Sequence, residues 1–214
     1  YLMISNLYTC RICFLVHIFF NNVIISKGKR RLNMYTLFID THFKDVQIVV
    51  YKDEKILKIS KIENCDKTSK NVLPLLNNLL QEFNIDYQKI NKIIVCNGPG
   101  SFTGIRIAIT IAKVMSYCLK IPIYTISYLE LQALDNIGEN TFAVKENNGY
   151  YKALFCNDEM ISPITYVKSK ELLNHELIVD NINYEKLLND KYLKLTDCYN
   201  ANPLYIKSIE ALND

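Results

Sequence analysis

The helix expected over residues 103–119 constrains the fold of this chain most, because it is apolar on nearly every side. Small residues recur at every fourth position, namely Gly104, Ala108, Ala112 and Ser116. They form one row along the helix, and such a row lets another backbone approach closely. The polar residues are confined to one stripe, made by Arg106, Thr110, Lys113 and Tyr117. A helix of this kind must be covered on most of its surface.

Cover for this helix can come from the chain itself or from a second protein. Its own sheet can cover one side, and a second amphipathic helix, expected over 72–83, can cover another. In a chain of 214 residues we expect a partner subunit to cover the remainder. The predicted interface combines the small-residue row with Leu76 and Leu80 of the second helix. Complete burial within the chain is the alternative.

A glycine-rich segment joins the apolar strand expected over 93–96 to this helix. A strand, a glycine-rich loop and a helix N-terminus in this order can offer backbone N–H groups to an anion. Neither common phosphate-loop pattern fits, because five residues separate Gly98 from Gly104 and Thr103 stands where a dinucleotide fold has its third glycine. The residues therefore leave open a degenerate phosphate loop and a tight turn without a ligand.

Short strands and helices surround this unit in a mixed order. Further strands are expected over 35–40, 46–51, 55–59, 123–126, 142–144, 151–155 and 177–179. Short helices are expected from Ser127 through Leu134 and over 169–173 and 184–188. The first three strands form a meander, and a hairpin turn is expected over 146–149. We expect Thr68 or Ser69 to cap the second helix, in which Pro74 is tolerable only if it lies in the first turn. This order predicts an α/β chain with mixed sheets.

Three regions follow from the pattern along the chain. Residues 1–33 are expected to be an extension outside the domain, a leader or read-through, and their apolar run is shorter than a membrane-spanning helix needs. Residues 34–134 are predicted to form a first lobe with the glycine-rich loop. Residues 135–214 are predicted to form a shortened second lobe and a C-terminal segment.

Composition narrows the functional classes. The net charge is only +3, and the lack of a long basic stripe argues against direct binding to nucleic acid. The seven cysteines are odd in number and irregularly spaced, which favours a reducing cytoplasm over a disulfide framework. Cys10 and Cys13 form a C-x-x-C pair, but neither a second pair nor a nearby histidine completes a zinc site.

The ten residues from Gly98 to Ile107, Gly-Pro-Gly-Ser-Phe-Thr-Gly-Ile-Arg-Ile, resemble the signature of the TsaB (YeaZ) family. Other segments agree in order. Phe38–Thr41 is similar to the family's opening I-D-T, Ser127–Glu130 to its S-x-L-E, and Pro203–Lys207 to its closing P-x-Y-[LI]-[RK]. The resemblance begins at Met34. The second lobe departs from the family pattern, since residues 145–151 keep only the glycine of D-A-R-x-G-E-V-Y.

The resemblance implies an actin-like, Hsp70-like fold (ASKHA, ribonuclease H-like) with two lobes and mixed sheets. It implies a cytoplasmic, non-catalytic subunit of the machinery that makes N6-threonylcarbamoyladenosine at adenosine 37 of tRNA. This subunit would bind and stabilise TsaD, the catalytic paralogue, and would work with the ATPase TsaE. Contact with tRNA would come only through the complex, pairing with a second copy stays open, and no membrane is involved. No cofactor is implied beyond weak binding of ATP or ADP.

A nucleotide-dependent enzyme of the actin-like class, such as a small kinase, is the alternative function. Its degenerate phosphate site would consist of Asp40, Thr41, Gly98, Pro99, Gly100, Ser101, Thr103 and Gly104. No second acidic group or lysine completes a cage for magnesium and phosphate in the sequence pattern, which favours a structural cap and turn. His42 is expected to be a solvated loop residue. Neither catalytic residues nor metal ligands are predicted.

Overall fold

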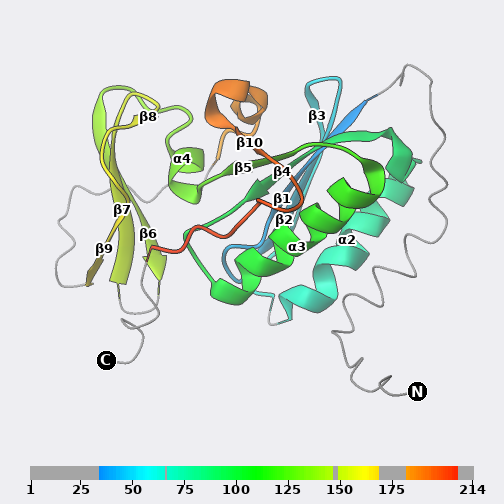
Figure 1. Ribbon diagram of the computed structural model, residues 1–214, viewed down its shortest axis with the longest axis horizontal. Coiled ribbons are helices and arrows are strands. Elements are labelled where there is room, and N and C mark those ends of the chain that lie inside the picture. The colour runs from blue at the N-terminus through cyan, green and yellow to red at the C-terminus, as the bar shows by residue number, and fades with distance from the viewer. Residues whose placement is uncertain (1–33, 66, 147–148, 169–181, 207–214) are drawn as a thin grey trace, which may run out of the picture.

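The computed structural model describes residues 34–65, 67–146, 149–168 and 182–206. They form a six-stranded mixed sheet and a smaller antiparallel sheet of four strands (Figure 1). Two long helices, α2 (Thr68–Glu82) and α3 (Phe102–Leu119), lie side by side over one face of the larger sheet. The short helix α4 (Tyr128–Gln132) and the smaller sheet pack toward its other face. This mixed α/β architecture is the predicted actin-like fold.

The larger sheet has the strand order β10-β5-β4-β1-β2-β3. Its strands are β1 (Tyr35–Asp40), β2 (Val46–Lys52), β3 (Lys55–Ile62), β4 (Ile90–Cys96), β5 (Ile123–Ile126) and β10 (Lys194–Thr196). The predicted meander of β1, β2 and β3 is confirmed, and β4 runs parallel to both β1 and β5. Strand β10 was not predicted. It pairs antiparallel with β5, so a segment late in the sequence adds an edge strand to the larger sheet.

The central strands are apolar on both faces because both faces are covered. In β1, Leu37 and Ile39 lie in the core beneath the two long helices, whereas Phe38 between them lies in the core on the opposite face. All three side chains are fully buried. The central strands are continuous apolar runs in the sequence because side chains on both faces of the sheet are buried.

Helix α2 begins four residues earlier than the apolar pattern predicts. Lys67 is its N-cap residue, and Thr68 and Ser69 lie inside the helix instead of capping it. Pro74 consequently falls in the second turn and not in the first, where its missing N–H would have been harmless. Its side chain is exposed. The carbonyl of Lys70, which would accept from residue 74 in an uninterrupted helix, loses that bond.

Helix α3 is the central helix of the fold. Its length and apolar composition would suffice to cross a membrane, but it packs on the sheet as a core helix. Ser101 caps its start by accepting a hydrogen bond from the Gly104 N–H. Its buried residues are Gly104, Ile105, Ile107, Ala108, Ile109, Ile111, Ala112, Met115, Ser116 and Leu119.

The smaller sheet consists of β6 (Glu139–Glu146), β7 (Gly149–Cys156), β8 (Glu159–Met160) and β9 (Thr165–Lys168). The predicted hairpin is confirmed, since β6 pairs antiparallel with β7; two residues of its turn, 147–148, lie outside the described residues. β8 and β9 both pair with β7 and were not predicted.

The remaining short elements fit the pattern in part. The start of α4 is as predicted, since Ser127 and Glu130 form a reciprocal capping box, although the helix ends at Gln132. The helix predicted over 184–188 is the 3₁₀ helix η3 (Lys186–Leu188), which η4 (Asp190–Tyr192) follows. A further 3₁₀ helix, η1 (Tyr87–Lys89), precedes β4. The helix predicted over 169–173 and the strand over 177–179 lie outside the described residues.

One core cluster joins the two sheets. It contains Phe38 and Tyr51 of the larger sheet, Phe142 and Phe155 of the smaller sheet, and Leu187 of η3. The buried Tyr51 hydroxyl donates a hydrogen bond of 2.8 Å to the carbonyl of Tyr184. Residues on both sides of the predicted lobe boundary, 134/135, therefore share this core.

Candidate functional site

The glycine-rich loop packs against the turn that follows β1. The Thr41 hydroxyl donates a hydrogen bond of 2.6 Å to the Gly104 carbonyl, and the Ser101 N–H donates one of 2.6 Å to the His42 carbonyl. A Cβ atom at Gly104 would lie 1.9 Å from the Thr41 carbonyl oxygen, and one at Gly100 would lie 2.4 Å from that of His42. Both glycines are therefore required by close backbone contact.

This packing occupies groups that a phosphate would need. The Ser101 and Gly104 N–H groups at the start of α3 donate to the His42 carbonyl and to the Ser101 hydroxyl. The predicted phosphate-site residues are nevertheless brought together: Asp40, Thr41, Gly98, Pro99 and Gly104 are buried, Gly100 and Ser101 are half-buried, and Thr103 is exposed. Their geometry is that of a tight turn braced by the end of β1.

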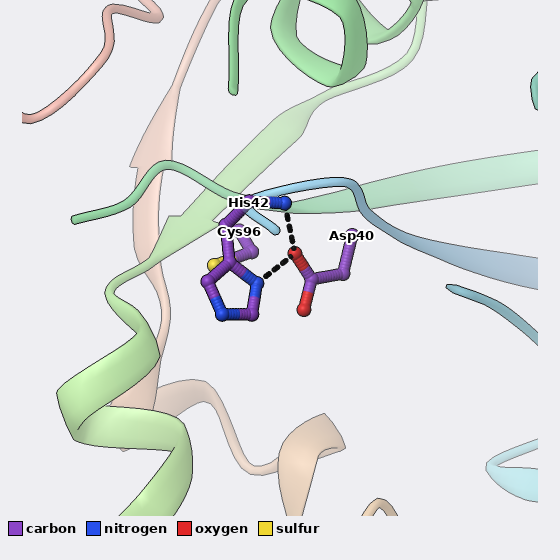
Figure 2. A group of neighbouring side chains, drawn as sticks. All are labelled: Asp40, His42 and Cys96. Carbon is purple, nitrogen blue, oxygen red and sulfur yellow. Dashed lines mark hydrogen bonds and ion pairs between the residues drawn. The ribbon is translucent and has the colours of Figure 1, made fainter. Parts of the chain in front are cut away.

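A cluster of Asp40, His42 and Cys96 lies beside this loop (Figure 2). One Asp40 carboxylate oxygen accepts two hydrogen bonds from His42, from the ring Nδ1 at 2.7 Å and from the backbone N–H at 3.0 Å. Because a carboxylate only accepts, this contact places the imidazole proton on Nδ1. A ring nitrogen, the Cys96 Sγ and a carboxylate oxygen all lie within 4.8 Å of one another.

The prediction that His42 is solvated is wrong. His42 is only 5% exposed, and its ring stacks on Tyr128 of α4, with 3.7 Å between the ring centroids, and contacts Phe43. Nε2 is buried and finds no hydrogen-bond partner among the described residues. The turn after β1 thus directs this histidine inward.

Sequence reasoning missed Cys96, although a pattern could have found it. Strands β1 and β4 are parallel neighbours, with Ile39 opposite Val95. Asp40 and Cys96 are the next residues of the two strands, so both stand where parallel strands end at the same edge of the sheet. The polar residues that end two adjacent apolar runs are therefore expected to meet.

Cys96 is a neutral thiol in this environment. Burial, and then the charge of the neighbouring Asp40 carboxylate, raise the pKa of the Cys96 thiol well above its usual value. A buried thiol of this kind is not an activated nucleophile. The cluster therefore lacks the thiolate–imidazolium pair of a cysteine hydrolase.

A cavity of about 400 Å³ opens beside the cluster. Its lining includes three acidic residues, Asp40, Asp45 and Glu63, and one lysine, Lys61. Lys61 Nζ lies 2.9 Å from Asp45 and 3.1 Å from Glu63. The hydrogen bond to Asp45 is the leading cause that raises the pKa of Lys61. The single ammonium of this lining is thus paired with carboxylates, and acidic groups predominate.

The predicted interface residues require a correction. Leu76 and Leu80 of α2 are buried, and so is the small-residue row of α3, made by Gly104, Ala108, Ala112 and Ser116. Gly104 lies directly against the end of β1, where a Cβ atom would meet the Thr41 carbonyl oxygen, and Ala108 and Ala112 belong to the core cluster that the two long helices share with the larger sheet. None of these six residues contributes to an exposed surface.

The exposed face of α3 consists of the polar stripe and Phe102 at the start of the helix. Within the stripe, Lys113 is half-buried and the other residues are exposed. Phe102 is 51% and Tyr117 65% exposed, although both are large aromatic side chains.

The last described residues run along this exposed face. The Arg106 Nε donates a hydrogen bond of 2.6 Å to the Tyr205 hydroxyl, and the guanidinium lies 3.5 Å from the centre of the Phe102 ring. Lys113 Nζ donates to the Tyr199 carbonyl at 3.3 Å. The exposed face of α3 and the segment 199–205 therefore form one continuous surface.

Comparison with known sequences points to one process. The family described as "TsaD: tRNA N6-adenosine threonylcarbamoyltransferase" matches residues 64–144. The tRNA threonylcarbamoyladenosine biosynthesis protein TsaB of Buchnera aphidicola subsp. Acyrthosiphon pisum is 27% identical over 156 residues, which are 72% of this chain and 67% of that protein. The TsaB protein of Bacillus subtilis is 33% identical over 100 residues, 47% of this chain and 44% of that protein.

A further TsaB protein, from Buchnera aphidicola subsp. Schizaphis graminum, is 41% identical over 98 residues, or 45% of this chain and 46% of that protein. The matches thus span two thirds of one relative and under half of two others.

Solved structures agree on the fold. The structure of YeaZ from Pseudomonas aeruginosa superposes with a TM-score of 0.64 at 17% sequence identity, over 81% of this chain and 100% of that chain. A Pseudomonas aeruginosa protein with similarity to peptidase YEAZ superposes with a TM-score of 0.67 at 16% identity and the same coverage.

Proposed function

The chain belongs to the TsaB (YeaZ) family, and from that membership we propose that it is a non-catalytic subunit in the synthesis of threonylcarbamoyladenosine in tRNA. One observation carries the proposal. The signature segment 98–107 is used to brace the end of β1 and to start α3, through the contact of Gly104 with Thr41. A segment used in this way supports a structural role for the protein and not a catalytic one.

The proposed partner is TsaD, the catalytic paralogue, and the proposed function is to stabilise it in the cytoplasm, with TsaE as a further component. We place the contact on the exposed face of α3, because the predicted small-residue row is buried. Exposed aromatic side chains are typical of the residues that anchor protein interfaces. Phe102 and Tyr117 meet this criterion at the two ends of the exposed face.

The alternative, a nucleotide-dependent enzyme, gains little support from the geometry. Acidic groups predominate around the cavity at the end of β1, and Lys61 is already paired with Asp45 and Glu63. Such a lining repels phosphate groups. Titration of the protein with ATP and magnesium checks this alternative: micromolar binding with turnover would favour the enzyme.

Binding to a TsaD homologue from the same organism tests the partner and the face. We expect the two proteins to co-elute in size-exclusion chromatography with light scattering. Thr110→Arg and Tyr117→Lys should each weaken the affinity, measured by calorimetry, at least about 10-fold, because both place a long cation on the face.

Ile137→Arg is the matched control. Ile137 is 87% exposed and precedes β6, away from α3, so this change should leave the affinity within a factor of about two. Separate elution of the wild-type chain and TsaD would reject the partner. Normal binding by both α3 variants would reject the face alone.

A further inference from the structure

The exposed aromatic residues of this chain lie on one surface. Among the residues that the structure describes, four aromatic residues are more than half exposed, and all of them belong to α3 or to the segment 199–205, namely Phe102, Tyr117, Tyr199 and Tyr205. The segment is fixed in place, because Ala201 is buried in the core and the Leu204 N–H donates a hydrogen bond of 2.8 Å to the Asn97 carbonyl. Aromatic side chains are enriched at protein interfaces. The segment 199–205 is therefore part of the same candidate interface as α3.

Arg106 contacts two of these rings. Its guanidinium lies 3.5 Å from the centre of the Phe102 ring and 5.5 Å from that of the Tyr205 ring, which are distances at which a cation is attracted to an aromatic face. Its Nε–H donates a hydrogen bond of 2.6 Å to the Tyr205 hydroxyl. The contacts come from both the helix and the segment 199–205, so they hold the guanidinium in one orientation.

The terminal nitrogens of Arg106 have no acidic partner within the described part of the chain. The described ion pairs involve other residues, and the hydrogen bond to Tyr205 uses only Nε. Arg106 is exposed, and its two terminal nitrogens form a planar fork of N–H donors that matches the two oxygens of a carboxylate. The exposed fork therefore suits an acidic side chain of another protein.

We propose that Arg106, held by Phe102 and Tyr205, binds a carboxylate of the partner subunit and so helps to select that partner. The inference rests on the proposed function, which places the partner on this face, and it adds the chemistry that the partner must carry, an Asp or Glu side chain. Aromatic residues around a contact exclude water from it, which strengthens the ion pair. Tyr205 is a positioning residue, because it acts by orienting Arg106.

Calorimetry with the TsaD homologue tests the role of Arg106. Arg106→Lys keeps the positive charge and loses the fork, whereas Arg106→Gln loses both. We expect the affinity to fall at least about 10-fold for Arg106→Lys and further for Arg106→Gln. Lys55→Gln is the matched control for charge, because Lys55 is exposed on β3, at the sheet edge opposite β10. It should leave the affinity within a factor of about two.

A double-mutant cycle tests whether Tyr205 acts through Arg106. Tyr205→Phe removes only the hydroxyl that accepts from Arg106. We expect it to lower the affinity about 3- to 10-fold in the wild-type chain and less than about 2-fold in the Arg106→Gln chain. Tyr199→Phe is the control, because the carbonyl of Tyr199, and not its hydroxyl, accepts from α3. Equal losses for Tyr205→Phe in both backgrounds would overturn the positioning role.

The outcomes separate this inference from the proposed function. Circular dichroism confirms that each variant is folded, as expected for changes at exposed side chains. Separate elution of the wild-type chain and TsaD would reject the proposed partner and this inference with it. Tight binding of the wild-type chain that Arg106→Lys and Arg106→Gln both leave unchanged would overturn this inference alone.

Discussion

Gly104 shows how little space the loop leaves for a side chain. A methyl group there would meet the Thr41 carbonyl oxygen at 1.9 Å, and the nearest atoms belong to the backbone, which cannot rotate away. We predict that Gly104→Ala lowers the free energy of unfolding by about 2–3 kcal/mol, since overpacking forces the helix from the strand end. Chemical denaturation followed by circular dichroism measures this loss.

Thr103→Ala is the control for that change. Thr103 is exposed in the same turn of α3, so the substitution should alter the free energy of unfolding by no more than about 0.5 kcal/mol. Equal effects of the two variants would contradict the role assigned to the backbone contact.

At the residue scale, part of the site could be predicted from the sequence. The glycine spacing left open a degenerate phosphate loop and a tight turn without a ligand, and the structure has a tight turn after the buried strand β4. The inward direction of His42 could not be predicted, because it depends on Tyr128 and Phe43, which pack on the ring in the fold. From sequence alone, a histidine that follows the end of a strand is predicted to be exposed, because the residues that pack on it are not known.

Pro74 disfavours the helix in which it lies. It lies in the second turn of α2, so the helix lacks one backbone hydrogen bond there. We predict that Pro74→Ala raises the free energy of unfolding by about 1–2 kcal/mol: the regained helix propensity exceeds the entropy that proline removes from the unfolded chain. Thermal unfolding measures the gain.

Asn78→Ala provides the comparison, one turn later at another exposed position of α2. It should raise the free energy of unfolding by only about 0.5 kcal/mol, because no hydrogen bond is regained. A destabilised Pro74→Ala variant would show that the proline is required by the packing of α2.

At the element scale, periodicity predicted the helices but not the direction of their faces. The apolar pattern of α3 correctly predicted that most of the helix surface is buried. Small residues, however, suit a contact with any nearby backbone, and the sequence does not distinguish a partner from the chain's own strand. Gly104 packs against the end of β1, the rest of the row is buried within the chain, and the polar stripe lies on the outer face of α3. The apolar pattern of α2 begins only at Val72, because the first turn of the helix, residues 68–71, carries no apolar residue.

In the whole molecule, the two sheets share one core cluster, and the Tyr51 hydroxyl of β2 donates a hydrogen bond within it to the carbonyl of Tyr184, just before η3. Tyr51→Phe removes the buried donor and leaves that carbonyl unpaired. We predict a loss of about 1–2 kcal/mol in the free energy of unfolding. Because the core is shared, hydrogen exchange in β2 and in β7 should both become faster by the same factor.

Tyr117→Phe is the control, since the Tyr117 ring is exposed and its hydroxyl loss should leave exchange in both strands unchanged. Faster exchange in β7 alone would mean that the smaller sheet opens as a separate unit.

At this scale, the order of the helices and strands could be predicted from the sequence. The pairing of β10 with β5 could not. Hydrophobic runs and turn residues gave the meander, the central helix and the hairpin in sequence. The return of β10 to β5 involves only the three residues Lys194–Thr196. A strand this short at a sheet edge has no apolar period to reveal it, since two of these residues are exposed.

The proposed role as a stabilising subunit is tested most directly by reconstitution. TsaD and TsaE homologues from the same organism, threonylcarbamoyl adenylate and an unmodified tRNA are incubated with and without this chain, and modified adenosine is quantified by mass spectrometry of digested tRNA. The account predicts that product forms at least about 10-fold faster with the chain present and that Tyr117→Lys abolishes most of this gain. Equal product formation with and without the chain would contradict it.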